Sequence, residues 1–267
     1  MLHALAHKFS VVQRMVQCYK NWPSLILYRL GIRPQPMVVR LRDGAKIKVR
    51  DRRKELSDAY VINESYLYGI HNDILPYFKN AKVGMDIGAH IGAFSIFAAK
   101  KSPAKIFAVE PAPNNRAVLA ENIALNNLES RITILPIAVM KERGTVPLFM
   151  PKNSGLVTTS RRHLDLYTAD EDTKTITVPA RTLEDIFTEQ KVAFCDFIKM
   201  DCEGAEYDIF YNAPKDLFKR IGLLTIECHK DGDINELMAF LRKQGFEVKR
   251  PTIEFGEIFC VRSTAFA

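Results

Sequence analysis

Acidic side chains stand at the ends of several apolar segments of this 267-residue chain. Asp86 lies near the end of the apolar run VGMDI, and Glu110 ends KIFAVE. Asp201 and Glu203 follow DFIKM, and His229 follows LLTIEC. Carboxylates accept hydrogen bonds from hydroxyl and ammonium groups, and a histidine with a pKa of about 6.5 exchanges protons near neutral pH. These residue types at these places predict a site that binds a polar ligand and moves a proton.

The elements that must position these residues are predicted from the alternation of apolar strands with helical segments. The strands are expected at residues 83–87, 105–109, 132–139, 194–200 and 222–228, and the helices at about 91–101, 113–126, 204–211 and 234–244. This alternation is typical of an α/β fold, a parallel sheet with helices on both faces. The segments GFEVKR and GEIFCVR predict a closing antiparallel hairpin. Ligands bind beyond the carboxyl ends of such strands, where the polar residues named above lie.

The segment MDIGAHIGAFS predicts a sharp turn from the first strand into a helix. Gly88 permits the tight turn, and Gly92 lets the helix pack closely on the strand. The spacing is G-x-x-x-G rather than the G-x-G-x-x-G of dinucleotide sites, and His90 stands where a pyrophosphate needs the closest approach. The pattern therefore favours a nucleoside ligand without a phosphate bridge. S-adenosylmethionine fits, with Asp86 facing its ammonium group and Glu110 accepting hydrogen bonds from both ribose hydroxyls.

Five segments, in this order and spacing, resemble the FkbM-type family of S-adenosylmethionine-dependent methyltransferases: MDIGAHIGAFS, FAVEPAPNNRAVLAENIALNNL, TLEDI, DFIKMDCEGAEYDIF and LLTIECH. The resemblance covers roughly residues 55–250. It implies a Rossmann-like seven-strand methyltransferase sheet and O-methylation, commonly of a sugar or natural-product hydroxyl.

The resemblance also implies residue roles. Asp86, Gly88, Ala89 and Gly92 would hold the methionine part of the cofactor, and Glu110 the ribose. Pro111 would shape the adenosine pocket, Ala138 would lie near the adenine, and Glu64, in VINESYLYG, would close over the cofactor. The family usually has Asn where this chain has His90, so His90 keeps the turn but its side-chain contact is open.

Methyl transfer to a hydroxyl requires the acceptor oxygen to be close, aligned and relieved of its proton. Asp201 is the first candidate for positioning or deprotonating the hydroxyl, and it also borders the cofactor site. Glu203 either assists or binds sugar hydroxyls, and His229 serves as base or acceptor ligand. The side chain of Glu227 is expected to point to the other side of the strand. Asp201, Glu203 and His229 could in principle hold a divalent metal, as in some catechol-type methyltransferases, but the Asp-Asn pair of those enzymes is missing and no metal is expected. Neither a zinc site nor disulfides are expected from five scattered cysteines.

The charge divides the chain into two parts. Residues 1–54 hold 13 Lys or Arg against two acids, a net of +11, and residues 55–267 hold 25 against 29, a net of −4. Residues 1–54 are predicted as a basic extension of amphipathic helices and a hairpin, and residues 55–267 as the catalytic domain with an inserted arm at about 140–182. The extension indicates an anionic partner, namely a membrane surface, a nucleic acid or a phosphorylated substrate, or a solvated face.

The sequence thus predicts an S-adenosylmethionine-dependent O-methyltransferase acting on a sugar, glycan, lipid-linked or natural-product hydroxyl. A nucleic-acid methyltransferase and a non-catalytic cofactor-binding module are the alternatives. The first lacks the N-P-P or D-P-P signature of amino-methylating enzymes, and the second conflicts with the intact acidic set. No apolar run reaches the roughly 18 residues of a membrane span, and no signal peptide is recognised, so a cytoplasmic chain, peripheral at most at the inner membrane face, is expected.

Overall fold

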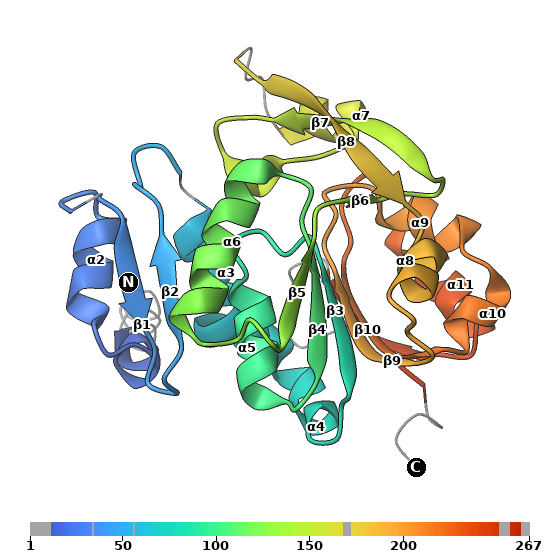
Figure 1. Ribbon diagram of the computed structural model, residues 1–267, viewed down its shortest axis with the longest axis horizontal. Helices are drawn as coiled ribbons and strands as arrows, with labels where there is room; N and C mark the ends of the chain where they lie inside the picture. The colour runs from blue at the N-terminus through green and yellow to red at the C-terminus, as the bar shows by residue number, and fades with distance from the viewer. Residues whose placement is uncertain (1–11, 34, 56, 168–171, 251–256, 263–267) are drawn as a thin grey trace, which may run out of the picture.

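The computed structural model describes residues 12–33, 35–55, 57–167, 172–250 and 257–262. Its centre is a seven-stranded sheet of order β11-β12-β10-β9-β3-β4-β5 (Figure 1). The strands are β3 (Val83–Ile87), β4 (Lys105–Val109), β5 (Ile132–Leu135), β9 (Cys195–Met200), β10 (Ile221–Glu227), β11 (Glu247–Lys249) and β12 (Glu257–Val261). Five of them are parallel, and β12 runs antiparallel to both β10 and β11. The predicted Rossmann-like sheet and its closing hairpin are confirmed.

Helices cover both faces of the sheet and bury a separate apolar core on each (Figure 1). One face carries α5 (Ala93–Lys101) and α6 (Pro113–Leu125). The other carries α8 (Leu183–Glu189), α9 (Glu206–Asn212), α10 (Lys215–Phe218) and α11 (Ile234–Lys243). Both faces of the sheet are therefore shielded from water, and this explains why the central strands consist of continuous runs of apolar residues.

One predicted strand is wrong in its extent. The segment 132–139 is two strands, β5 and β6 (Ala138–Val139), separated at Pro136. Proline has no N–H to donate to a ladder, so the chain leaves the main sheet there. The second piece, β6, pairs with β8 (Lys174–Arg181) in another sheet. This break moves Ala138 from the main sheet to the edge of the ligand cavity described below.

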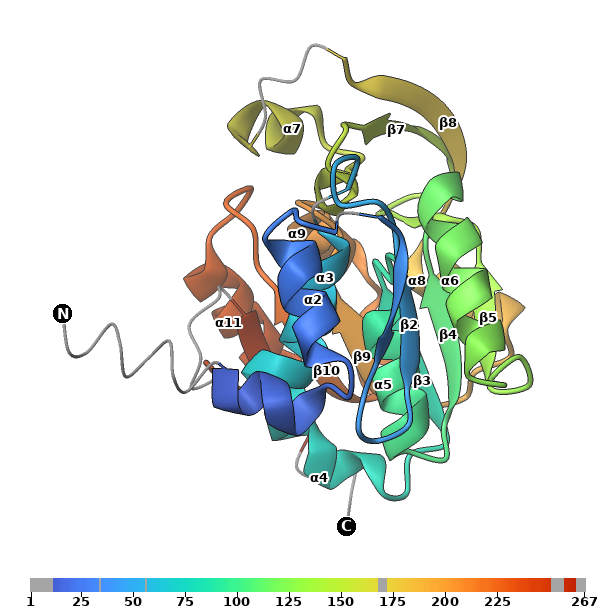
Figure 2. The same cartoon turned by 90° about the vertical axis from the view of Figure 1, so that its left-hand side faces the viewer.

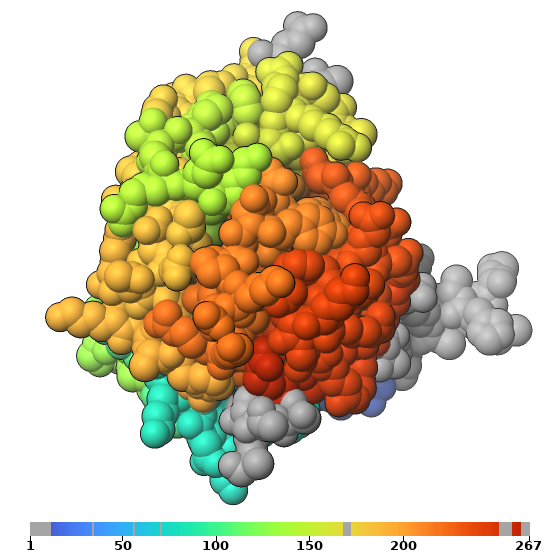
Figure 3. All heavy atoms as spheres, turned by 90° about the vertical axis from the view of Figure 1, so that its right-hand side faces the viewer, coloured from blue at the N-terminus to red at the C-terminus, as the bar shows by residue number. Residues whose placement is uncertain are grey.

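The predicted arm is a hairpin of β7 (Gly144–Met150) and β8, joined by a 3-10 turn, η3 (Ser154–Leu156), and by α7 (Arg161–Tyr167). With β6 these strands form a three-stranded sheet of order β6-β8-β7. The arm lies over the carboxyl ends of the main strands (Figure 2). In the space-filling view it covers one end of the C-terminal elements (Figure 3). The expected loop within it includes residues 168–171, which lie outside the described residues.

The segment before the sheet is helical. It consists of α3 (Asp58–Asn63), a π-helical turn η1 (Glu64–Tyr68), a 3-10 turn η2 (Ile70–Ile74) and α4 (Leu75–Phe78). Across the described residues, no helix is both long and apolar enough to cross a membrane. The five cysteines form no disulfide.

The N-terminal extension folds against α6. It contains a helix over residues 12–18, α2 (Trp22–Arg29) and the predicted antiparallel hairpin of β1 (Met37–Arg40) and β2 (Lys46–Val49). The expected helical positions Leu2, Leu5 and Phe9 lie outside the described residues.

Two asparagines one turn apart on α6 attach this extension to the body. The carboxamide of Asn122 accepts the N–H of Lys48 at 2.6 Å and donates to the carbonyl oxygens of Lys48 at 3.2 Å and Ile91 at 2.9 Å. Asn126 accepts the N–H of Lys46 at 3.0 Å and donates to its carbonyl at 2.6 Å. The side chains thereby pair with the backbone of β2 in the manner of a neighbouring strand.

We expect Asn122→Ala to lower the free energy of unfolding by about 2–4 kcal/mol, because it leaves several backbone groups of a buried junction without partners. Asn114→Ala, on the exposed side of the same helix, is the matched control and should change it by less than about 0.5 kcal/mol. Urea unfolding followed by circular dichroism measures both. Equal stability of the two variants would show that the carboxamide contacts do not hold the extension.

Candidate functional site

The turns after β3 and β9 touch backbone to backbone. Gly88 has φ 80°, and a Cβ there would lie 1.7 Å from the carbonyl oxygen of Asp201. The N–H of Asp201 in turn donates to the carbonyl of Ile87 at 3.0 Å. Only glycine fits at position 88, for both reasons. Gly92, with φ 86°, packs under Leu119 and borders none of the cavities below, so its place is structural.

Asp86 lies fully buried beneath this turn. Its Oδ2 accepts a hydrogen bond from Ser95 Oγ at 2.5 Å, whereas Oδ1 has no partner among the described residues. Burial raises the pKa of Asp86. The carboxylate borders a cavity of about 400 Å³ that Glu64 and Ala89 also line. An oxygen that is buried and unpaired at a cavity wall is suited to a ligand that donates a hydrogen bond.

Glu110, whose side chain is 4% exposed, lines a second cavity of about 680 Å³. Its two oxygens accept the N–H groups of His90 and Ala112, each at 2.8 Å. Burial raises the pKa of Glu110 to about 7. Oε2 retains a second lone pair that a ligand hydroxyl can use, and Oε1 also accepts a long hydrogen bond of 3.5 Å from Asn115 Nδ2, which is weak enough for a ligand hydroxyl to replace. Pro111 and Ala138 line the same cavity, as do Gly88, His90 and Asp201, so six of the residues predicted for the cofactor site meet there.

His90 has φ 50°, an unusual value for a residue with a side chain. Its Nε2 lies 2.6 Å from Ser154 Oγ in the arm and 3.3 Å from an Arg50 nitrogen in the extension. Burial, aided by the charge of Arg50, lowers the pKa of His90 to about 3, so the imidazole is neutral. The side-chain contact that the sequence left open is thus a link between body, arm and extension.

Arg50 is the centre of this link. It donates to both carboxylate oxygens of the fully buried Asp58, with the Nε–Oδ2 distance at 3.0 Å, to Asn115 Oδ1 at 2.9 Å and to Ser154 Oγ at 2.8 Å. Ser154 and Asn115 also line the Glu110 cavity. Through Arg50, the basic extension therefore holds one wall of the site in place. The net charge of the extension alone does not reveal this role.

The ends of β9 and β10 bring several carboxylates together with Lys199 and His229. Lys199 Nζ lies 2.9 Å from Asp201 Oδ2. Glu206 accepts the N–H of Cys202 at 2.8 Å and lies 3.0 Å from His229 Nδ1. Asp201 Oδ1 is buried without a hydrogen-bond partner among the described residues, 3.9 Å from His229 Nε2.

Charges decide the protonation of these groups. Burial by itself would raise the pKa of Asp201, but Lys199 and His229 outweigh it, so the pKa is lowered. Burial would lower the pKa of His229, yet the hydrogen bond with Glu206 and the charges of Glu206, Glu203 and Asp201 raise it to about 11. In this state His229 carries a proton and Asp201 does not. Asp201 is consequently the better placed of the two to accept a proton.

A third cavity, of about 1350 Å³, lies next to the Glu110 cavity and shares Val61, Gly155, Asp201 and Glu203 with it. Its further lining is mostly polar and aromatic: Ser57, Tyr60, Glu64, Asn153, Tyr167, Glu227, His229 and Lys230, with Leu156 and Cys228. The expectation that Glu227 points away is wrong, since its Oε1 lies 3.8 Å from His229 Nε2. Glu227 and His229 are two residues apart, and side chains two apart along a strand lie on the same side of it, so the alternation itself predicts that they meet.

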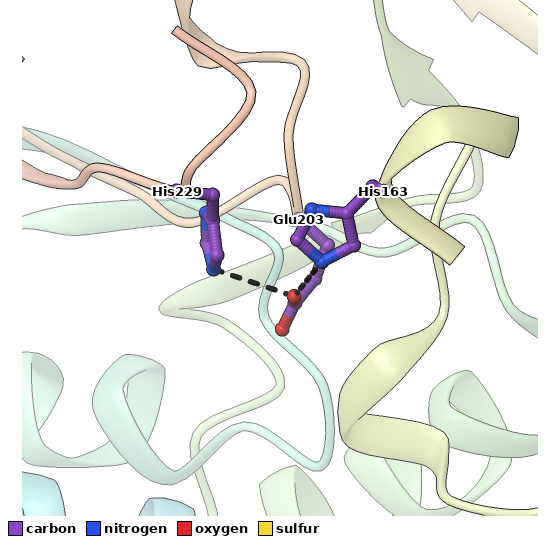
Figure 4. Close-up of side chains that lie close together, drawn as sticks. All are labelled: His163, Glu203 and His229. Atoms are coloured by element: carbon purple, nitrogen blue, oxygen red, sulfur yellow. Dashed lines mark hydrogen bonds and ion pairs between the residues drawn. The ribbon is translucent and has the colours of Figure 1, made fainter. Parts of the chain in front are cut away.

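Sequence reasoning missed His163. This residue of α7 is fully buried, with Nε2 2.8 Å from Glu203 Oε2 and Nδ1 2.7 Å from Asp231 Oδ2 (Figure 4). Glu203 has φ 52°, a strained value that directs its side chain toward the arm. Lys199 was also missed, although its position in K-x-D-x-E-G-x-E was a usable signal.

A sequence model of the family described as "Methyltransferase FkbM domain" matches residues 86–248. The chain belongs to this family. It is an S-adenosylmethionine-dependent methyltransferase, and S-adenosylmethionine is its cofactor.

Three relatives of this FkbM-family methyltransferase are similar over most of their own length. Methyltransferase sdnD from Sordaria araneosa is 30% identical over 64% of this chain and 76% of its own. 31-O-demethyl-FK506 methyltransferase FkbM from Streptomyces tacrolimicus is 28% identical over 62% and 73%. 2-O-methyltransferase NoeI from Sinorhizobium fredii (strain NBRC 101917 / NGR234) is 27% identical over 67% and 76%. Among solved structures, the METTL16 MTase domain has a TM-score of 0.46 at 16% identity over 73% of this chain and 65% of that one, a similarity too weak to support an argument.

We expect Arg50→Ala in the methyltransferase to lower the free energy of unfolding by about 3–5 kcal/mol, because it leaves the buried Asp58 carboxylate unpaired. Arg53→Ala removes an ion pair with Asp51 whose arginine side chain is 67% exposed, and should cost less than about 1 kcal/mol. Denaturant unfolding of both variants tests this. Similar losses in the two would contradict a special role of the Arg50 link.

Proposed function

We propose that this methyltransferase transfers a methyl group to a hydroxyl of a sugar, glycan, lipid-linked or natural-product acceptor. The observation that carries the proposal is the pair of adjoining cavities with Asp201 and Glu203 on their shared wall. One cavity has the lining expected for a nucleoside, and the other is polar and large enough for a polyhydroxylated acceptor. The names of two relatives, 2-O-methyltransferase NoeI and 31-O-demethyl-FK506 methyltransferase FkbM, support a hydroxyl acceptor.

The residues fit the cofactor at both ends. The unpaired Asp86 oxygen suits an ammonium group, and Gly88 and Ala89 line the space beside it. Glu110 has free lone pairs for ribose hydroxyls, while Pro111 and Ala138 line the remaining cavity. When bound, S-adenosylmethionine supplies an electrophilic methyl group on a sulfonium. We assign Glu64, on the wall of the smaller cavity, to closing over the methionine end.

The acceptor hydroxyl is assigned to the wall shared by the two cavities. Asp201 is ionised there, so it can orient the hydroxyl and accept its proton. Glu203 and His229 line the acceptor cavity and serve as hydrogen-bond partners of neighbouring hydroxyls. His229, protonated in this state, acts as a donor rather than as the base that the sequence suggested.

The basic extension supports an anionic partner. Lys48, Arg50 and Lys54 line a further cavity of about 1220 Å³ together with Lys152 and Lys174 of the arm. Clustered Lys and Arg attract phosphate groups, either of a phosphorylated acceptor or of a cytoplasmic membrane surface. A nucleic-acid acceptor is disfavoured, because the carboxylates around the acceptor cavity repel a polyphosphate backbone.

We expect S-adenosylhomocysteine to bind about tenfold more weakly at pH 6 than at pH 7.5. Glu110 must be ionised to accept both ribose hydroxyls, and below its pKa of about 7 each pH unit costs a factor of about ten. Isothermal titration at the two pH values measures this. Glu110→Gln should bind more weakly at pH 7.5 and lose most of the pH dependence; the same dependence in both proteins would exclude Glu110 as the ribose ligand.

We expect methyl transfer from labelled S-adenosylmethionine to sugar, lipid-linked or natural-product alcohols. These acceptors are tested with and without phosphate groups. RNA, DNA and anionic vesicles are tested as alternative acceptors in parallel reactions. With the best acceptor, Asp201→Asn should reduce kcat by about 10²–10⁴-fold, because the carboxamide cannot take the proton. Isothermal titration with S-adenosylhomocysteine should show that Asp201→Asn still binds the cofactor product. Transfer to nucleic acid alone, or an unchanged kcat, would overturn the assignment.

A further inference from the structure

The side chains of His163, Glu203 and His229 form a compact cluster from three separate parts of the chain. His163 belongs to α7 of the arm, Glu203 to the turn after β9, and His229 to the turn after β10 (Figure 4). One nitrogen of each imidazole and one oxygen of the carboxylate lie within 4.8 Å of one another. In Figure 4 both rings direct a nitrogen at Glu203.

The distances suit a small cation. Glu203 Oε2 lies 2.8 Å from His163 Nε2 and 3.3 Å from His229 Nε2. A tetrahedral transition-metal ion holds nitrogen and oxygen ligands at about 2.0–2.2 Å, which places the ligand atoms roughly 3.3 Å apart. The two distances from Glu203 to the histidines, 2.8 and 3.3 Å, are therefore close to this spacing.

Each histidine is oriented by a second carboxylate. Asp231 Oδ2 lies 2.7 Å from Nδ1 of His163, and Glu206 Oε1 lies 3.0 Å from Nδ1 of His229. A carboxylate at Nδ1 keeps a proton on that nitrogen, so the ion binds at Nε2 and displaces the second proton that His229 carries when no metal is bound. This carboxylate–histidine arrangement is the usual support of metal-ligating histidines.

Further oxygen donors surround this group. Besides Glu203, the carboxylates of Asp201 and Glu227 lie 3.9 and 3.8 Å from His229 Nε2. Asp201, Glu227 and His229 form a second group whose ligand atoms also lie within 4.8 Å of one another. The first group therefore has further oxygen donors on the side of the acceptor cavity, which Asp201, Glu203 and Glu227 line.

We propose that His163, Glu203 and His229 bind one divalent transition-metal ion such as Zn²⁺, with an open coordination position toward the acceptor cavity. Two histidines and one carboxylate are a donor set typical of catalytic zinc, which keeps a position for water or substrate. The prediction of a site without metal rested on a missing Asp-Asn pair, whereas the ligand that completes this set comes from the arm.

The ion has two consequences. It fastens the arm to the body, because His163 is the arm's ligand and Glu203 and His229 are the body's. The ion also lowers the pKa of an acceptor hydroxyl bound at the open position, and this second consequence rests on the proposed function. The hydroxyl proton then passes to the nearby carboxylate of Asp201. The binding of the ion itself does not depend on the identity of the acceptor.

The test is titration of the full-length, chelator-treated protein with Co²⁺, followed by displacement with Zn²⁺. We expect one equivalent of Co²⁺ with visible absorption of a four- or five-coordinate ion, lost on addition of Zn²⁺. His163→Ala and Glu203→Gln should abolish the spectrum. Asp231→Asn, which removes only the support of His163, should weaken binding by about 10–100-fold.

Arg161→Ala is the matched control, since Arg161 lies on α7 and pairs with Asp165 at the surface. It should bind Co²⁺ as the unaltered protein does. Binding of S-adenosylhomocysteine is measured in every variant to show that it folds. Less than a tenth of an equivalent of Co²⁺ in the unaltered protein, or an unchanged spectrum in folded His163→Ala, would overturn the metal site. Metal binding without methylation of any hydroxyl would refute the proposed acceptor class alone.

Discussion

The ion pair between Lys199 and Asp201 is the contact on which the site depends. Lys199 pairs in register with Asp86 on the neighbouring strand, and its Nζ lies 2.9 Å from Asp201 Oδ2. Burial alone would lower the pKa of this lysine, but Asp201 and Asp86 raise it. One buried cation thus balances carboxylates of both the cofactor side and the acceptor side. Without this lysine, the carboxylates at the ends of β3 and β9 would repel each other at this short distance.

The close contact of Gly88 with Asp201 makes the two sides one unit. The cofactor turn and the acceptor turn share backbone packing and the wall between their cavities. The arm and the extension are attached to this unit by polar groups, through Ser154 with Arg50 and through His163 with Glu203. Such contacts are directional, so they place the covering segments more closely than apolar packing would.

The sequence was most informative where local structure determines position. Strand ends are marked by a change from apolar to acidic residues, and this located Asp86, Glu110 and Asp201. His163 could not be found, because nothing local fixes where a helix inside a long hairpin returns to the body. The helix α8 was also missed, although Thr182 and Asp185 form a capping box in TLED. Glu227 was misplaced because the alternation was applied wrongly: Glu227 and His229 are two residues apart and therefore share one side of the strand.

The charge of the acceptor cavity itself selects among acceptors. Asp201, Glu203 and Glu227 border it, and carboxylates near an amine favour its protonated form. An aliphatic amine would therefore be held as a cation without a nucleophilic lone pair. A hydroxyl stays neutral there, donates its hydrogen to a carboxylate and keeps its lone pairs. Under the proposed function, the same carboxylates would trap an amine and activate an alcohol, and this asymmetry favours oxygen as the acceptor atom.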